Sequence, residues 1–279
     1  MCQFCVQHGD GKTWYLQAEN YVIDLEHDLE RRGYIVDFVQ GFDGMRSRAL
    51  TWLDVLEKTP RPLESAVKTR IHKRQQLHHF GQPVPIEDCE RIFDFATSIV
   101  RLPCACRTYA GKAERGHCLA VTATPMDDTL AEAFAGFEMG PDIAGLERLT
   151  KDQAMALLRQ CEKDGLMHSV WTFVTPFIGA ICNCDLESGC MAMTLTVGHD
   201  TKVMWRGEYV AELAEESCSR CGACAQVCPF DAIDFERAPR SVTLRQRDCW
   251  GCGVCRAACP SDALRLVPRA SVPEVAEIW

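Results

Sequence analysis

The sequence predicts an α+β protein in two parts, a mixed α/β, cysteine-rich domain over residues 1–200 and a smaller domain over residues 201–268. Helical and strand periodicities alternate in the first part, which is typical of a mixed core. The second part has short strands, and from residue 218 it repeats itself with an offset of 31 residues. Such a repeat indicates two copies of one unit packed about an approximate two-fold axis. Residues 269–279 are expected to form a C-terminal tail.

The composition is that of a soluble globular protein. The chain has 279 residues, of which 47% are hydrophobic and 25% are charged, enough for one large domain or two smaller ones. The longest nearly apolar run, residues 170–182, contains threonines, a proline and a glycine and is too short to cross a bilayer. The N-terminus lacks the basic segment, apolar core and cleavage site of a secretory signal. We therefore expect no transmembrane segment and a cytoplasmic location.

Cysteine is the residue type that stands out. The 18 cysteines favour metal binding over a disulfide framework, because the cytosol keeps thiols reduced. The formal net charge of −9 argues against nucleic acid as the main partner and suits docking onto a basic patch of another protein. The chain contains no Gly-x-Gly-x-x-Gly or Walker sequence, so nucleotide binding is not indicated.

Two helices are predicted near the N-terminus. Residues 14–32 have apolar side chains at three- and four-residue spacing, and Gly33 follows as a stop signal. A second helix is expected near residues 45–58. The basic stretch 61–74 that follows is most simply a solvated helix face; the alternative is a phosphate or nucleic-acid patch.

Two further predicted helices each carry one cysteine on an apolar face. Residues 87–100 would bury Cys89, and residues 151–164, which begin with the capping box Thr150-x-x-Gln153, would bury Cys161. We expect both thiols to be small core residues rather than ligands.

Strands are expected on either side of residue 200. Residues 168–178 are rich in Val, Thr, Phe and Trp, which favours a strand. Residues 202–205 and 208–212 are predicted to pair as a hairpin around Arg206-Gly207.

The repeated unit of the second part is a run of four cysteines followed by proline. The runs are Cys218-x-x-Cys221-x-x-Cys224-x-x-x-Cys228-Pro229 and Cys249-x-x-Cys252-x-x-Cys255-x-x-x-Cys259-Pro260. Three thiolates at this spacing can wrap around one corner of a cubane cluster, and nearby glycines permit a close backbone approach. The pattern resembles bacterial dicluster ferredoxins, in which the first three cysteines of a run bind one cluster and the fourth binds the other.

This resemblance implies two 4Fe-4S clusters with interleaved ligands in a ferredoxin-like domain. Zinc also accepts four thiolates, but zinc sites rarely use two interleaved runs. One cluster would be bound by Cys218, Cys221, Cys224 and Cys259, and the other by Cys249, Cys252, Cys255 and Cys228.

The N-terminal domain contains two similar motifs, each a C-x-C pair with a later third cysteine. The sets are Cys104, Cys106 and Cys118, and Cys182, Cys184 and Cys190. In a strand, residues i and i+2 face the same side, so such a pair can present two thiolates to one metal centre. We favour a further iron–sulfur cluster; a structural zinc or a set of buried reduced thiols are the alternatives.

Three residues near these motifs or at the N-terminus have a less defined pattern. His117, beside Cys118, is expected to be a surface histidine, with a ligand or a hydrogen-bond donor as the alternatives. Cys2-x-x-Cys5 is expected to bind metal, as half a zinc site or a cluster ligand pair; a redox dithiol is the alternative.

The segments Pro103-Cys104-x-Cys106-Arg107 and Cys182-Asn183-Cys184, placed before a ferredoxin-like region, resemble a family of bacterial and archaeal iron–sulfur proteins. The resemblance spans residues 85–268. Many members carry adjacent cysteines after Cys-Asn-Cys, where this chain has Asp185. The resemblance implies electron transfer alongside a larger redox enzyme.

Three hypotheses for function follow. The first is an electron-transfer subunit or carrier without catalytic residues of its own, whose partner is a flavoprotein or a larger oxidoreductase. The second is an iron–sulfur oxidoreductase whose N-terminal centre has an open coordination site beside a cleft. The third is a redox-sensing regulator, against which the acidic charge and the two complete cysteine runs count.

Overall fold

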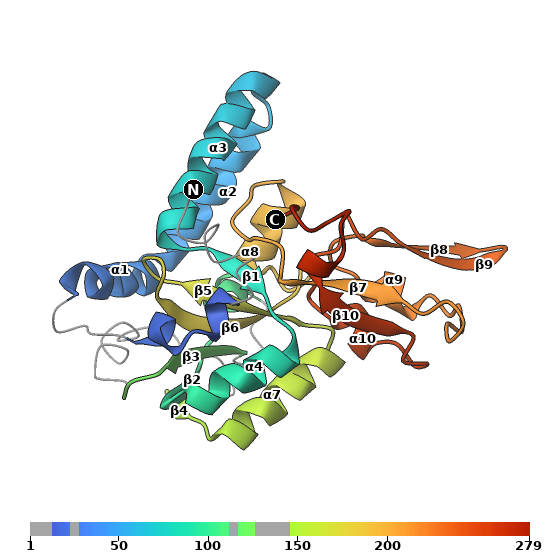
Figure 1. Ribbon diagram of the computed structural model, residues 1–279. Coiled ribbons are helices and arrows are strands. Elements are labelled where there is room, and N and C mark those ends of the chain that lie inside the picture. Colours follow the sequence, from blue (N-terminus) through green and yellow to red (C-terminus); the bar gives the residue numbers. More distant parts are fainter. Residues whose placement is uncertain (1–12, 23–27, 112–116, 126–145) are drawn as a thin grey trace.

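The computed structural model describes residues 13–22, 28–111, 117–125 and 146–279. Its centre is a six-stranded antiparallel sheet with the strand order β1-β5-β6-β3-β2-β4 (Figure 1). The strands are β1 (Gly81–Pro83), β2 (Ser98–Leu102), β3 (Cys118–Thr122), β4 (Glu147–Arg148), β5 (Met167–Thr172) and β6 (Ile178–Cys184).

One face of this sheet packs against α4 (Ile86–Phe95), α7 (Lys151–Lys163) and the short 3-10 helices η1 (Trp14–Leu16) and η2 (Ala18–Tyr21). Alternate residues of the strands, such as Leu119 and Ile181, are fully buried beneath these helices. The alternation therefore leaves the intervening residues of the same strands for the opposite face.

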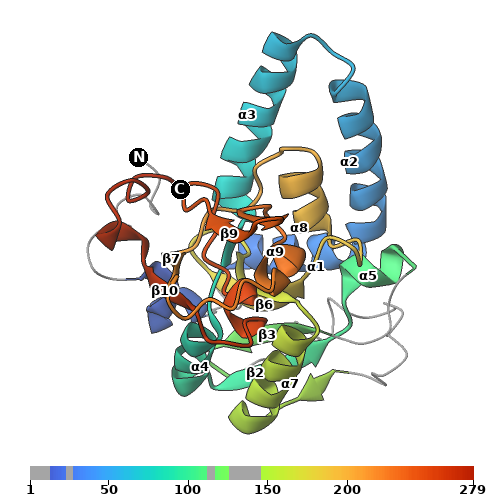
Figure 2. The same ribbon diagram turned by 90° about the vertical axis from the view of Figure 1, so that its right-hand side faces the viewer.

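The opposite face packs against α1 (Leu29–Gln40) and, near the C-terminal end of β6, against α8 (Met191–Met193) and the π-helix η3 (Thr194–Gly198). The helix α5 (Ala105–Tyr109) follows β2. Two long helices, α2 (Phe42–Leu56) and α3 (Arg61–His78), form a hairpin that projects from the body of the protein (Figure 2).

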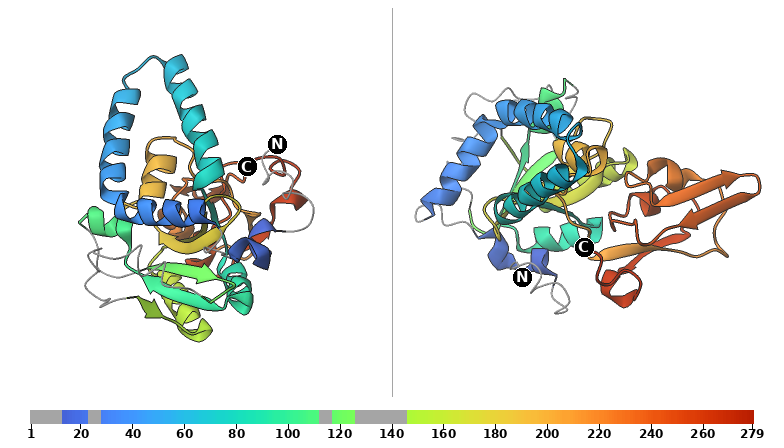
Figure 3. Two further views of the ribbon diagram at one scale, coloured as in Figure 1. Left: turned by 90° about the vertical axis from the view of Figure 1, so that its left-hand side faces the viewer. Right: turned by 90° about the horizontal axis from the view of Figure 1, so that it is seen from above.

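The C-terminal module lies beside the sheet domain (Figure 3). In this module β7 (Tyr209–Leu213) pairs with β10 (Leu264–Pro268), and β8 (Ile233–Arg237) pairs with β9 (Arg240–Leu244). Two short helices, α9 (Ala223–Val227) and α10 (Val254–Ala257), each follow a cysteine loop. After η4 (Arg269–Ser271) the tail returns to this core, where Val275 is fully buried.

The helix predicted over residues 14–32 is wrong. Trp14 and Tyr15 instead lie in a 3-10 turn, because both rings are buried and the Tyr15 hydroxyl donates a hydrogen bond to Asp88 at 2.8 Å. The helix begins later, with Asp28 as its N-cap, and continues through Gly33. Tertiary contacts of the aromatic side chains outweigh the local periodicity here.

Two other element predictions need correction. The helix over residues 87–100 ends at Phe95, because the β-branched pair that follows, Ile99 and Val100, joins strand β2. The hairpin around residue 207 does not form either. Gly207 instead connects the two parts of the protein: a Cβ atom there would lie 2.8 Å from the Pro83 carbonyl oxygen and 2.9 Å from that of Trp250.

Other expectations are confirmed, wholly or in part. The helices near 45–58 and 151–164 form, the latter with its Thr150–Gln153 capping box. The strand predicted over residues 168–178 forms only in its first part: β5 ends at Thr172, and a second strand begins at Ile178 after a turn. Cys89 and Cys161 are buried core thiols with 0% and 1% exposure. In the part of the chain that the structure describes, no helix is long and apolar enough to span a membrane.

Candidate metal centres

The two cysteine runs of the C-terminal module adopt the same backbone geometry. Gly222 and Gly253, 31 positions apart, both have left-handed φ values, 79° and 82°, and each precedes the short helix that carries the third cysteine of its run. The other left-handed residues also occur in matched pairs, Arg220 with Gly251 and Asp231 with Asp262. The repeat in the sequence is therefore a repeat in structure.

Backbone amides point at the thiol sulfurs of both runs. The N–H of Ala232 donates to Cys228 Sγ and that of Ala263 to Cys259 Sγ, each at 3.3 Å. Cys218 and Cys249 likewise accept from backbone N–H groups of their own loops, at 3.4 Å. Such donors stabilise thiolates and the sulfur atoms of a cluster, so these loops suit an anionic iron–sulfur group.

Electrostatic interactions between the thiols reach from each run to the other. Cys228 interacts electrostatically with Cys249, Cys252 and Cys255, the first three cysteines of the opposite run. Cys224 interacts with Cys218 and with Cys259 of the opposite run. The fourth cysteine of each run therefore lies across the module, as cluster sharing requires.

Two arginines hold the loop at Cys249. Arg269 is fully buried, and its guanidinium donates to the carbonyl oxygens of Cys249 and Tyr209, both at 2.9 Å, and of Gly207 at 2.8 Å. Arg206 donates to the Cys249 carbonyl at 3.2 Å. Burial lowers the pKa of Arg269 to about 10, although nearby Cys249 raises it, so the side chain is still a cation at neutral pH and favours an anionic group beside it.

Gly251 is a position where the cysteine loop depends on glycine. Its φ is 73°, and a Cβ atom would collide with the carbonyl oxygen of Tyr209. We expect Gly251→Ala to destabilise the module by about 2–4 kcal/mol, because strain and a backbone collision add. Urea unfolding followed by the visible absorbance of the clusters would measure this. Gly198→Ala, which meets nothing within 4 Å, is the control, and equal midpoints for both variants would contradict the prediction.

The structure also brings together all six patterned cysteines of the N-terminal domain. Cys182 and Cys184 end strand β6, and both face the side of the sheet opposite α4 and α7. The register Leu119↔Ile181 places Cys118 of β3 beside Cys182 on this same face. Cys104 and Cys106 lie at the start of α5, and Cys190 precedes α8.

Hydrogen bonds between thiols connect these six residues into one continuous chain. The order is Cys104, Cys118, Cys182, Cys184, Cys190 and Cys106. The six are free thiols, buried or half-buried, and come from four separate segments. Both cysteines of each C-x-C pair therefore belong to the same connected set of thiols.

The environment of these thiols separates their pKa values. Hydrogen bonds to Cys118 and Cys190, together with burial, raise the pKa of Cys104 and Cys106 well above the usual range. Cys190 accepts hydrogen bonds from Cys106 and Cys184, and these lower its pKa well below the usual value despite burial. Cys190, which lies between Cys184 and Cys106 in this set, is therefore the thiol that is most readily deprotonated, and metal binding requires deprotonated cysteines.

A buried arginine, Arg107, lies beside these thiols. The sequence shows only that it follows Cys106 in the motif. Arg107 is 4% exposed and pairs with Asp185 at 3.1 Å. One of its nitrogens lies 3.8 Å from Cys104 Sγ and 3.1 Å from the Asn183 carbonyl oxygen, to which it donates. The same nitrogen is 3.2 Å from His117 Nδ1, so the expectation that His117 lies on the surface is wrong; it is buried.

Among the described residues, no group of three or more His, Cys, Asp or Glu side chains is arranged to bind a single metal ion. This holds for the eight cysteines of the C-terminal module as well, because thiolates around a cubane stand farther apart than the ligands of one ion. The six N-terminal thiols are a donor set that zinc and iron–sulfur clusters both accept. Cys2 and Cys5 lie outside the described residues.

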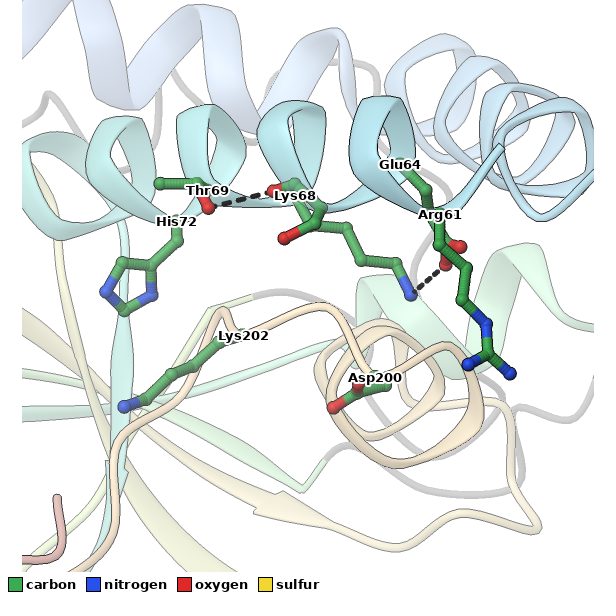
Figure 4. Close-up of a pocket in the computed structure, with 8 residues that line it drawn as sticks. Arg61, Glu64, Lys68, Thr69, His72, Asp200 and Lys202 are labelled. Carbon is green, nitrogen blue, oxygen red and sulfur yellow. Dashed lines mark hydrogen bonds and ion pairs between the residues drawn. The ribbon is translucent and has the colours of Figure 1, made fainter. Parts of the chain in front are cut away.

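The basic stretch lines a pocket that contains no cysteine. A cavity of about 500 Å³ lies between α3 and residues 200–202 (Figure 4). Lys68 pairs with Glu64 at 2.8 Å and donates to the His199 carbonyl oxygen at 2.7 Å. Arg70 and its basic neighbours on α3 are exposed, and none of the residues of this helix is buried. The stretch is a solvated helix face, as expected.

Comparison with known proteins identifies one part of the chain. No curated protein matches it. Residues 200–263 match the family model of the 4Fe-4S dicluster domain, a range that includes both cysteine runs and both matched loops. This match supports iron–sulfur clusters over zinc in the C-terminal module and, with them, a role in electron transfer. Residues 200–263 of this chain are therefore a ferredoxin-type 4Fe-4S dicluster domain.

Proposed function

We propose that this protein relays electrons through the two C-terminal 4Fe-4S clusters and a third, N-terminal iron–sulfur centre, to or from a redox protein partner. The observation that carries the proposal is the convergence of six N-terminal cysteines from four segments into one connected set of thiols. A dicluster domain alone needs none of them. Their ordered placement beside such a domain favours a further redox centre on the same path.

We assign the ligands as the spacing predicts. Cys218, Cys221, Cys224 and Cys259 would hold one C-terminal cluster, and Cys228, Cys249, Cys252 and Cys255 the other. Four of the six N-terminal thiols would suffice for the third centre, whose chemistry would be one-electron oxidation and reduction.

The side chains around the N-terminal thiols have separate roles in this proposal. The Arg107 guanidinium compensates the negative charge of thiolates and cluster, since its interactions with Cys104, Cys184 and Asp185 outweigh burial and raise its pKa. Asn183 fixes the β6 end, with its Oδ1 2.5 Å from His168 Nδ1 and its Nδ2 donating to the His117 carbonyl. Both kinds of contact favour a preorganised, anionic and mostly dry site.

The partner that fits this role is a flavoprotein or a larger oxidoreductase in the cytoplasm. The dicluster domain supplies one-electron steps, and proteins of these classes exchange single electrons with such domains. The chain would then serve as an electron-transfer component of an oxidoreductase system rather than as its catalytic part.

Anaerobic purification followed by iron, sulfide and zinc analysis tests the proposal. We expect about twelve iron and twelve sulfide atoms per chain, because each cubane holds four of each, and no stoichiometric zinc. A content of about eight iron atoms, with or without zinc, would confine the redox centres to the C-terminal module and contradict the N-terminal centre.

A further inference from the structure

The N-terminal thiols and one of the two cysteine runs share a single apolar core. This core contains Cys184 and Cys190 from the N-terminal domain and Val254 from the second run, all at most 6% exposed. Cys182 and Cys252 pack against the same core. We call it the bridging core; its buried members are Met167, Trp171, Ala180, Cys184, Cys190, Ala192, Met193, Val203, Met204 and Val254.

The loop of the second run is fixed at this junction. Trp250 stacks on Phe230 with ring centres 4.6 Å apart and planes 6° apart, and both rings pack on the bridging core. The Trp250 carbonyl oxygen accepts a hydrogen bond from the Gly207 N–H at 2.8 Å. From the other side of the loop, Arg256 of α10 pairs with Glu87 of α4 at 2.8 Å. The second run therefore faces the sheet domain.

The first run, by contrast, is exposed at its second cysteine. Cys221 is exposed, as are Ser219 and Arg220 beside it, whereas Cys252, at the matched position of the second run, is half-buried against the bridging core. The two matched loops thus differ in the one respect that matters for electron exchange, their access to other molecules.

We propose a fixed order for the relay: N-terminal centre, then the inner cluster of Cys228, Cys249, Cys252 and Cys255, then the outer cluster of Cys218, Cys221, Cys224 and Cys259. The outer cluster is the point of exchange with a one-electron redox protein. This order rests on the proposed function. In each exchange one electron passes from the reduced outer cluster to the oxidised partner, or in reverse, and no proton or group is transferred.

Spin coupling tests which cluster neighbours the N-terminal centre. In the fully reduced protein, the electron paramagnetic resonance (EPR) signal of that centre should be broadened by its nearest paramagnetic neighbour. We expect Cys252→Ser, which replaces one ligand sulfur of the inner cluster by oxygen, to change this broadening. The matched variant Cys221→Ser should change the outer cluster's own signal and leave the broadening as it is. The opposite pattern would overturn the order.

Exchange with a protein-sized oxidant tests the outer surface. The probe is ferric cytochrome c, which takes one electron from the reduced protein. Ser219→Trp places at the outer loop the ring that Trp250 provides at the matched inner position, and it should slow this reaction several-fold. Thr51→Trp adds the same ring to an exposed site on α2 and should leave the rate within twofold. Equal rates for the two variants would show that the outer cluster is not the point of exchange.

The two proposals fail in different ways. If the third EPR signal and its iron are absent, the proposed function loses its N-terminal centre, and the order loses its first member. If the third signal is present but responds only to Cys221→Ser, the three-centre function stands and the order is wrong.

Discussion

Replacing Cys118, Cys182 and Cys184 together by alanine is expected to remove about four iron atoms per chain and to leave both C-terminal clusters intact. These three residues are on the sheet, and only three of the six connected thiols remain without them. Cys104 is linked to the other thiols through Cys118, so the three that remain no longer form one connected set and the centre should not assemble. Iron analysis and EPR of the reduced variant would measure the loss.

The control for this variant removes two cysteines that lie outside the patterned sets. Cys89 on α4 and Cys161 on α7 are more deeply buried, with 0% and 1% exposure. Replacing both by alanine should cost stability of about 1 kcal/mol for each small cavity but no iron. A triple variant that keeps the full iron content, or a control that loses the same amount, would contradict the assignment.

The second large effect is expected on removing the clusters from the C-terminal module. The core of this module is built partly from its own ligands: Cys224, Cys249 and Cys255 are buried there, beside small apolar residues such as Ala211 and Ala232. Without clusters, the thiolates that these backbone amides stabilise repel one another in a core that has few large apolar side chains to hold it together. Metal binding therefore supplies much of its folding free energy.

Hydrogen exchange can locate this unfolding. After oxidative cluster loss and chelation, we expect the amides of β7 and β10 to exchange close to the rate of an unfolded chain. Those of α4, which packs on the sheet and binds no cluster, should stay protected. Unchanged protection of β7 and β10, or an unchanged circular dichroism spectrum, would show that the module folds without its clusters.

The parts that the sequence predicted correctly depend on local spacing. The two cysteine runs and the capping box of α7 each involve residues close together in the chain, so their geometry follows from the pattern. The pairing of Cys182 with Cys184 also followed from strand alternation.

The remaining features depend on contacts between distant segments. Spacing alone does not give the register that places Cys118 beside Cys182. It also does not show that Cys104, Cys106 and Cys190 join these two residues in one connected set of thiols. Trp14 and Tyr15 left the predicted helix because their rings are buried against the sheet domain. The burial of His117 against Arg107 likewise appears only once β3 and β6 are paired.

The number of electrons that the protein stores tests the central claim most directly. A coulometric reductive titration of the anaerobically purified protein, followed by EPR spin counting, should give three electrons per chain, one for each cluster. The triple cysteine variant should give two. An uptake of two electrons by the native protein, with spectra identical to those of the triple variant, would contradict an N-terminal redox centre.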